Sequence, residues 1–267
     1  MSRLRLSCQE QLLPGQRLEE KFEFAVAAGF DGIELRGRGQ YALAERLPLL
    51  RAALRAGVVL PTVCVEMSHF VGAFDPELRR DAVDQLKSQL TVAAELGGIG
   101  VMTPAAWGMF SRRLPPFEPP RDQREDRAVL VDSFGELAEH AAAAGVLILL
   151  EPLNRYEDHM VNRLEQAVEL CRAVGVASMR VAGDFYHMNI EEDDISASLT
   201  AAAPYLAHLQ ASDSNRLQPG AGHLDWRSAL ATLDTDGYQG WIAYECRLRG
   251  AAEQALPASV AFLRGQR

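Results

Sequence analysis

The hydrophobic positions of this chain follow two alternating patterns. Short continuous apolar runs alternate with longer stretches in which apolar residues recur every three or four positions. A short apolar run bounded by turn residues is typical of a strand buried in a parallel sheet, and the longer period is typical of an amphipathic helix. Glycine follows several of the helical stretches, as at Gly29, Gly57, Gly145 and Gly175, where a helix C-cap favours it.

The two patterns predict strands and helices in strict alternation. The strands are expected at residues 4–8, 32–36, 58–65, 99–103, the run starting at Val146, 179–184, 206–212 and 240–246. The helices are expected at residues 17–28, 43–56, 76–96, 126–144, 162–174, 193–203, 226–233 and 251–264. Such alternation over this length favours an α/β protein with a single (β/α)8 TIM barrel over a doubly wound sheet. We expect residues 1–267 to form one domain.

The longest irregular connection is predicted at residues 108–121. Four of its residues are proline, which neither a helix nor an interior strand tolerates. Long loops in compact domains are usually functional or disordered. Trp107 and Phe110 either form an apolar wall of a pocket or pack the loop, and Arg112 and Arg113 either meet a phosphate or stay solvated.

Oxygen-bearing side chains end four consecutive predicted strands. Glu151 shares a strand face with Leu149, and Asp184, Gln210 and Glu245 lie at or near the ends of the next three strands. In a TIM barrel the active site is built at the carboxyl ends of the strands. Because adjacent strands lie ~4.8 Å apart, the four side chains are expected to converge.

These four side chains favour a divalent metal ion. A buried carboxylate is costly without a partner, and carboxylate and amide oxygens suit Mg²⁺ or Mn²⁺ better than a structural zinc. We therefore predict one divalent ion held by Glu151, Asp184, Gln210 and Glu245, with Mn²⁺ or Mg²⁺ preferred and Zn²⁺ or Co²⁺ left open.

Other polar residues fall near the same strand ends. His187 and Arg216 follow the sixth and seventh strands, and we interpret both as substrate-binding residues. Glu34, Glu66 and His69 also fall near strand ends, and the sequence leaves open whether they line the pocket. His159 and His223 are interpreted as ordinary surface or loop histidines.

Composition and charge limit the kinds of molecule that the protein is expected to bind. The net charge of −9 argues against binding to nucleic acid, which usually requires a basic patch. The four scattered cysteines are typical of reduced thiols. Residues 1–10 do not resemble a secretory signal, and the apolar run at Val146 is too short to span a membrane. The expected protein is cytoplasmic, with a small-molecule substrate and no membrane partner.

Four longer motifs resemble the xylose-isomerase-like barrels, and within them the sugar isomerase and epimerase branch that contains D-tagatose 3-epimerase and hydroxypyruvate isomerase. The motifs are LEPLNRYEDHM from Leu150, GDFYHMNIEEDD from Gly183, HLQASDSNRLQPGAGHLDW from His208 and YEC from Tyr244. GFDGIEL from Gly29 is also typical of this superfamily.

The resemblance implies a catalytic mechanism and an assembly. It implies that Glu151 and Glu245 move protons as well as hold the metal, through an enediolate of the substrate. It also implies that Glu157, His187 and Arg216 contact the sugar or keto-acid substrate. Homodimers and homotetramers are common among such proteins.

The subfamily and the reaction stay open at this stage. Ketose 3-epimerases carry histidine where this chain has Gln210, whereas hydroxypyruvate-isomerase-like members carry glutamine, and the SDSNR and PGAGH segments are more typical of epimerases. Two glutamates acting at one carbon give epimerisation, and one glutamate acting at adjacent carbons gives isomerisation. The alternatives are a dehydratase of a polyol or inosose, a sugar-binding barrel without activity and, least favoured, a metal-dependent AP endonuclease.

Overall fold

A closed ring of parallel strands forms the centre of the computed structural model, which describes residues 3–109 and 119–267. The strands are β1 (Arg5–Gln9), β2 (Gly32–Arg38), β3 (Thr62–Glu66), β4 (Gly100–Pro104), β5 (Leu147–Glu151), β6 (Met179–Asp184), β7 (Leu206–Ala211) and β8 (Trp241–Tyr244). Each pairs with the next in sequence, and β8 pairs with β1, so that the sheet has no edge. The predicted (β/α)8 TIM barrel is confirmed.

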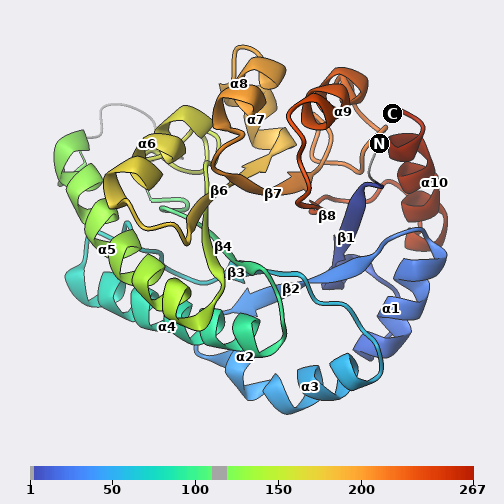
Figure 1. Cartoon of the computed structure of the whole chain (residues 1–267), viewed down its shortest axis with the longest axis horizontal. Helices are drawn as coiled ribbons and strands as arrows, with labels where there is room; N and C mark the ends of the chain where they lie inside the picture. Colours follow the sequence, from blue (N-terminus) through green and yellow to red (C-terminus); the bar gives the residue numbers. More distant parts are fainter. Residues whose placement is uncertain (1–2, 110–118) are drawn as a thin grey trace.

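Helices surround the ring (Figure 1). They are α1 (Leu18–Ala27), α2 (Ala42–Glu45), α3 (Leu47–Arg55), α4 (Pro76–Glu95), α5 (Gln123–Ala144), α6 (Leu164–Val174), α7 (Phe185–Glu191), α8 (Ile195–Ala202), α9 (Trp226–Thr235) and α10 (Ala252–Arg264), with a 3-10 turn at Glu10–Leu12. Within the described part of the chain, no helix has the length and apolar character that crossing a membrane requires.

Proline explains two differences from the predicted elements. The helix predicted at 43–56 is divided into α2 and α3, because Pro48 at the start of α3 has no N–H group and its ring clashes with the preceding turn. The strand predicted to start at residue 58 starts at Thr62, directly after Pro61, because proline cannot donate to a sheet ladder.

The segment after β6 is helical, which the sequence did not predict. The Asp184 carboxylate caps α7 by accepting hydrogen bonds from the backbone N–H groups of Tyr186 (2.6 Å) and His187 (3.3 Å). Asp is a favoured N-cap residue. The strand β8 is also shorter than predicted and ends at Tyr244, so Glu245 lies just beyond it.

The core has two layers. The larger one fills the space between the sheet and the helices, and a small apolar layer of Met102, Leu149 and Ala182 fills the barrel interior. Simple alternation along β7 would put Leu206 on the same face as His208, but the register shifts between β6 and β7, so that Ala207 packs with the interior layer and Leu206 with the larger layer. This irregularity is a β-bulge, which re-aims the side chains that follow it. Above the apolar layer, the interior becomes polar.

Candidate active site

The four predicted metal ligands lie at the carboxyl ends of β5 to β8. Glu151 and Asp184 are the last residues of β5 and β6, Gln210 is the second-last residue of β7, and Glu245 follows β8. Glu151, Asp184 and Gln210 are buried, whereas the Glu245 side chain is 24% exposed. Strand alternation therefore aims these groups into the barrel as expected.

Arg216 joins two of these carboxylates. Its Nη1 donates to Asp184 Oδ2 at 2.6 Å, and its Nη2 donates to Glu245 Oε2 at 2.7 Å. The guanidinium also lies over the Tyr186 ring, 4.9 Å from the ring centroid. One cation thus spans both groups, which shows that Asp184 and Glu245 are close enough to share a positive charge.

The electrostatics of the acidic cluster call for such a positive charge. Burial, followed by repulsion from Glu245 and Asp184, raises the pKa of Glu151 well above its usual value. Burial also raises the pKa of Asp184, against the opposing effect of Arg216. Like charges that share a buried site disfavour ionisation unless a cation compensates them.

Two side-chain oxygens at the acidic cluster, one from a carboxylate and one from an amide, are available to bind a ligand. Glu151 Oε1 and Gln210 Oε1 are buried and have no hydrogen-bond partner within residues 3–109 and 119–267. Buried polar atoms are normally hydrogen-bonded, so unpaired oxygens beside a carboxylate cluster fit coordination of a cation. The residues present therefore fit a divalent metal ion with oxygen ligands.

His187 approaches the cluster from α7. Ligand atoms of Glu151, Asp184 and His187 all lie within 4.8 Å of one another, and His187 Nε2 is 3.8 Å from Glu151 Oε1. However, His187 Nδ1 accepts a hydrogen bond from the backbone N–H of Asn154 at 3.1 Å. Burial, followed by repulsion from Arg216, lowers the pKa of His187 to about 3. The ring is therefore neutral with its proton on Nε2, which makes it a hydrogen-bond donor toward the cluster rather than a metal ligand.

Glu157 belongs to the loop after β5 and lies near His187 of α7. Its carboxylate accepts hydrogen bonds from Asn154 Nδ2 at 3.1 Å and from Trp107 Nε1 at 3.2 Å. Burial raises the pKa of Glu157, but the effects of its polar neighbours, including these two hydrogen bonds, outweigh burial and the net shift is downward. Asn154 thus holds two of the three predicted substrate-binding residues, because it also donates to His187.

A family comparison agrees with this arrangement. Residues 22–266 match the family described as the xylose isomerase-like TIM barrel, which is nearly the whole chain. The chain belongs to this family.

Sugar epimerases are similar to this chain over most of its length. A 3-dehydro-D-guloside 4-epimerase of Escherichia coli (strain K12) is 38% identical over 98% of this chain and 99% of its own length. A D-psicose 3-epimerase of Enterocloster bolteae is 32% identical over 82% of this chain and 73% of its own length. The crystal structure of a 3-keto-D-glucoside 4-epimerase from E. coli, in its apo form, has a TM-score of 0.93 at 37% identity and covers 98% of this chain and 100% of its own. Our chain, as a member of the xylose isomerase-like family, is therefore an enzyme of the isomerase and epimerase class.

Glu34 is a site residue that the sequence left undecided. It lies inside the barrel on β2 and is completely buried, with hydrogen bonds to four side chains. Its position between Ile33 and Leu35 in an apolar strand was the available signal, because a charged residue there must face a polar interior. Glu66 pairs with Arg36 and Arg38 and lines a cavity that Glu245 also lines. His69 pairs with Asp81 and does not line that cavity.

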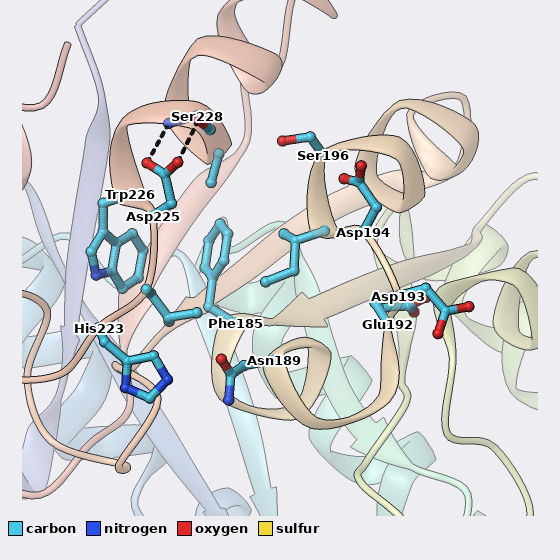
Figure 2. A pocket seen from close by; sticks show the side chains of 13 residues that line it. Phe185, Asn189, Glu192, Asp193, Asp194, Ser196, His223, Asp225, Trp226 and Ser228 are labelled. Carbon is cyan, nitrogen blue, oxygen red and sulfur yellow. Dashed lines mark hydrogen bonds between the residues drawn. The ribbon is translucent and has the colours of Figure 1, made fainter.

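Two of the cavities that the described residues form lie near the carboxyl end of the barrel. The larger, of about 490 Å³, lies between α7, α8 and the start of α9 (Figure 2). Its carboxylates already have structural partners: Asp194 and Asp225 cap helices, and Glu192 and Asp193 pair with Arg163. The smaller, of about 220 Å³, is lined by Arg216 and Glu245, together with Gln9, Gln11, Arg36, Cys64, Val65, Glu66, Cys246 and Arg247. The smaller cavity therefore opens onto Glu245, one of the two predicted catalytic glutamates, and onto Arg216.

Asp213 fixes the loop that carries Arg216. Its carboxylate accepts hydrogen bonds from the backbone N–H groups of Ser214 (2.8 Å), Gly220 (2.8 Å) and Leu224 (3.1 Å), and from Trp226 Nε1 (3.0 Å). Burial raises the pKa of Asp213, but these donors outweigh burial and the net shift is downward. The loop therefore depends on an ionised Asp213.

We expect Asp213→Ala to lower the free energy of unfolding by about 2–4 kcal/mol at pH 7, because it leaves several buried donors unpaired. Since the folded-state pKa of Asp213 is lowered, its contribution is present above the unfolded value of about 3.9 and is lost as the pH falls through the folded-state pKa. Urea denaturation from pH 7 downward measures both effects. Asp225→Ala, which removes an exposed helix cap, serves as the control and should cause a smaller loss. A difference between wild type and Asp213→Ala that stays constant below pH 4 would contradict this account.

Proposed function

We propose that this protein is a divalent-metal-dependent epimerase that inverts the carbon next to the keto group of a keto-sugar. The observation that carries the proposal is the cluster of buried Glu151 and Asp184 with partly exposed Glu245 at the carboxyl end of the barrel, where one oxygen each of Glu151 and Gln210 has no hydrogen-bond partner among the described residues. The full-length similarity to a 3-dehydro-D-guloside 4-epimerase supports epimerisation over the isomerase and dehydratase alternatives.

Glu151, Asp184, Gln210 and Glu245 would hold the metal ion. Their oxygen atoms favour Mn²⁺ or Mg²⁺ over metals that prefer sulfur and nitrogen ligands. When bound, the ion supplies Lewis-acid stabilisation of the negative charge that develops on the substrate oxygens during deprotonation.

The two glutamates would move the proton. Glu151 ends β5 and Glu245 follows β8, so two strands of the ring separate them and they approach a substrate from different sides. One carboxylate removes the proton from the carbon next to the carbonyl group, and the other delivers a proton to the opposite face of that carbon. This transfer inverts the configuration through an enediolate and needs no other acid or base.

Three further residues would position the substrate. His187 donates through Nε2, because Asn154 occupies its other nitrogen. Arg216 offers donors beside Asp184 and Glu245, and the Glu157 carboxylate accepts from sugar hydroxyl groups. Fixed donors and acceptors of this kind hold the reacting carbon against the catalytic base.

The proposed substrate is a 3-keto-glycoside whose C4 is inverted. This assignment comes from the similarity to the E. coli 4-epimerases. The 220 Å³ cavity beside Glu245 supports it, because Gln9, Gln11, Arg36 and Arg247 give it a strongly polar lining suited to sugar hydroxyl groups. A free ketose or a small keto-sugar acid is the alternative substrate.

Proton NMR in D₂O tests the reaction. We expect 3-keto-glycosides to incorporate deuterium at C4 with inversion when Mn²⁺ is present, and to show no exchange in EDTA. Ketoses and hydroxypyruvate belong in the same panel, since exchange at C3 of a ketose or at the hydroxymethyl carbon of hydroxypyruvate would redirect the assignment. Loss of a hydroxyl group from the substrate would indicate a dehydratase. Metal binding without any exchange would leave a sugar-binding barrel and would refute the epimerase proposal.

We further propose that the enzyme is a cytoplasmic homodimer or homotetramer, as the family resemblance implies. Light scattering of the purified chain measures the oligomeric state, and a monomer at micromolar concentration would contradict the assembly.

A further inference from the structure

One carboxylate inside the barrel collects four hydrogen bonds. Glu34 Oε1 accepts from the side-chain amides of Gln9 (3.2 Å) and Gln210 (3.1 Å). Glu34 Oε2 accepts from the Thr62 hydroxyl (2.7 Å) and from His208 Nε2 (2.8 Å). Both Glu34 and His208 are completely buried, and a carboxylate in such a place requires this number of donors.

This carboxylate decides which end of the Gln210 amide faces the metal site. An ionised carboxylate only accepts hydrogen bonds, so Gln210 must turn its NH₂ group toward Glu34. Its oxygen then points elsewhere, and within the described residues that oxygen is buried without a partner. A half-turn of the amide would instead place this oxygen against Glu34 Oε1, at the position where the 3.1 Å hydrogen bond now lies.

Gln9 connects Glu34 to Glu245, a second proposed metal ligand. Its Nε2 donates to Glu34 Oε1 and also to Glu245 Oε1 at 3.1 Å. Gln11 donates to Gln9 Oε1, which fixes the orientation of the Gln9 amide. Glu34 is therefore connected to Gln210 directly and to Glu245 through one amide.

We propose that Glu34 is a positioning residue for the metal site, which holds the Gln210 amide with its oxygen toward the divalent ion and steadies Glu245 through Gln9. The proposal rests on the proposed metal site. It adds that an amide ligand must be held in one of its two orientations. An amide has one coordinating end and one donating end, and a buried acceptor beside it selects between them.

Mn²⁺ binding to Glu34→Leu tests the proposal, with free Mn²⁺ measured by electron paramagnetic resonance. Leucine has a similar size and cannot accept a hydrogen bond, so the Gln210 amide loses its fixed orientation. We expect the dissociation constant for Mn²⁺ to rise at least ~10-fold, as for other outer partners of metal ligands. In a Gln210→Ala background, the same replacement is expected to raise the constant clearly less than it does in the wild type, because only the connection through Gln9 to Glu245 remains and residues that act through one another are not additive.

Two further variants separate orientation from charge and from stability. In Glu34→Gln, the one remaining oxygen can face Gln9 and Gln210 while the new NH₂ faces His208, whose Nδ1 has no partner among the described residues and can take the proton. We therefore expect Glu34→Gln to bind Mn²⁺ within threefold of wild type. Glu10→Leu removes another buried carboxylate, which pairs with Arg46, and is expected to leave Mn²⁺ binding unchanged.

Each outcome has a distinct meaning. Unchanged Mn²⁺ binding in Glu34→Leu, or an equal loss in both backgrounds, would overturn the positioning role while leaving the proposed epimerase intact. An equal loss in Glu34→Gln and Glu34→Leu would assign the effect to charge and would also overturn it. If the wild-type protein did not bind Mn²⁺, both the metal site and the positioning role would fail. Should circular dichroism show that Glu34→Leu does not fold, Glu34→Ala undergoes the same comparison.

Discussion

Glu151→Gln and Glu245→Gln are each expected to lower kcat for epimerisation by about 10²–10⁴-fold, the range for loss of a general acid or base. Glutamine keeps the size of the side chain and one oxygen that can bind a cation, but it cannot take up or release the proton. Because the two carboxylates approach from β5 and β8, each serves one face of the reacting carbon. Turnover of both epimers by each variant gives the measurement.

Deuterium exchange sharpens this prediction. A variant that keeps one glutamate is expected to exchange the C4 proton of one epimer with solvent without inverting it, and the two variants should differ in which epimer exchanges. Glu165→Gln, on the exposed side of α6, is the matched control and should keep full activity. Substantial epimerisation by both active-site variants would refute the mechanism with two carboxylates.

Removal of the divalent ion is expected to abolish turnover and to destabilise the protein. Three carboxylates of the cluster face one another, and burial and mutual repulsion already raise the pKa of Glu151. We expect treatment with EDTA to lower kcat at least ~100-fold, because the ion stabilises charge in the transition state by several kcal/mol. Mn²⁺ at 100 times its dissociation constant should stabilise the folded state by about 2.7 kcal/mol.

Activity and the thermal unfolding midpoint, measured in EDTA and after addition of Mn²⁺, provide the check. Asp184→Asn should lose most of the thermal shift, since it removes one charge from the proposed ligand set, whereas Asp225→Asn on the surface should keep it. Full activity in EDTA, with no shift on addition of Mn²⁺, would exclude a catalytic metal.

Local sequence patterns predicted the barrel and the positions of the candidate ligands at the strand ends. Apolar runs marked the strands, and alternation placed Glu151, Asp184 and Gln210 on inward faces, because both signals depend only on neighbours in the chain. The predictions failed where proline or a cap controlled the backbone. Pro48 separates α2 from α3, and Asp184 starts a helix in a segment for which the sequence predicted none. Residues 110–118, including Phe110, Arg112 and Arg113, lie outside the described residues, so their predicted roles stay predictions.

The sequence by itself determined the strand order, the buried acids at the strand ends and the family resemblance. Only the tertiary structure decided which side chains meet inside the barrel. Closure of β8 against β1 brings Gln9 to Glu245, 236 positions apart in the chain, and the ring brings Glu34 to Gln210. Such contacts depend on barrel closure and on the bulge in β7, and no local period of apolar residues encodes them.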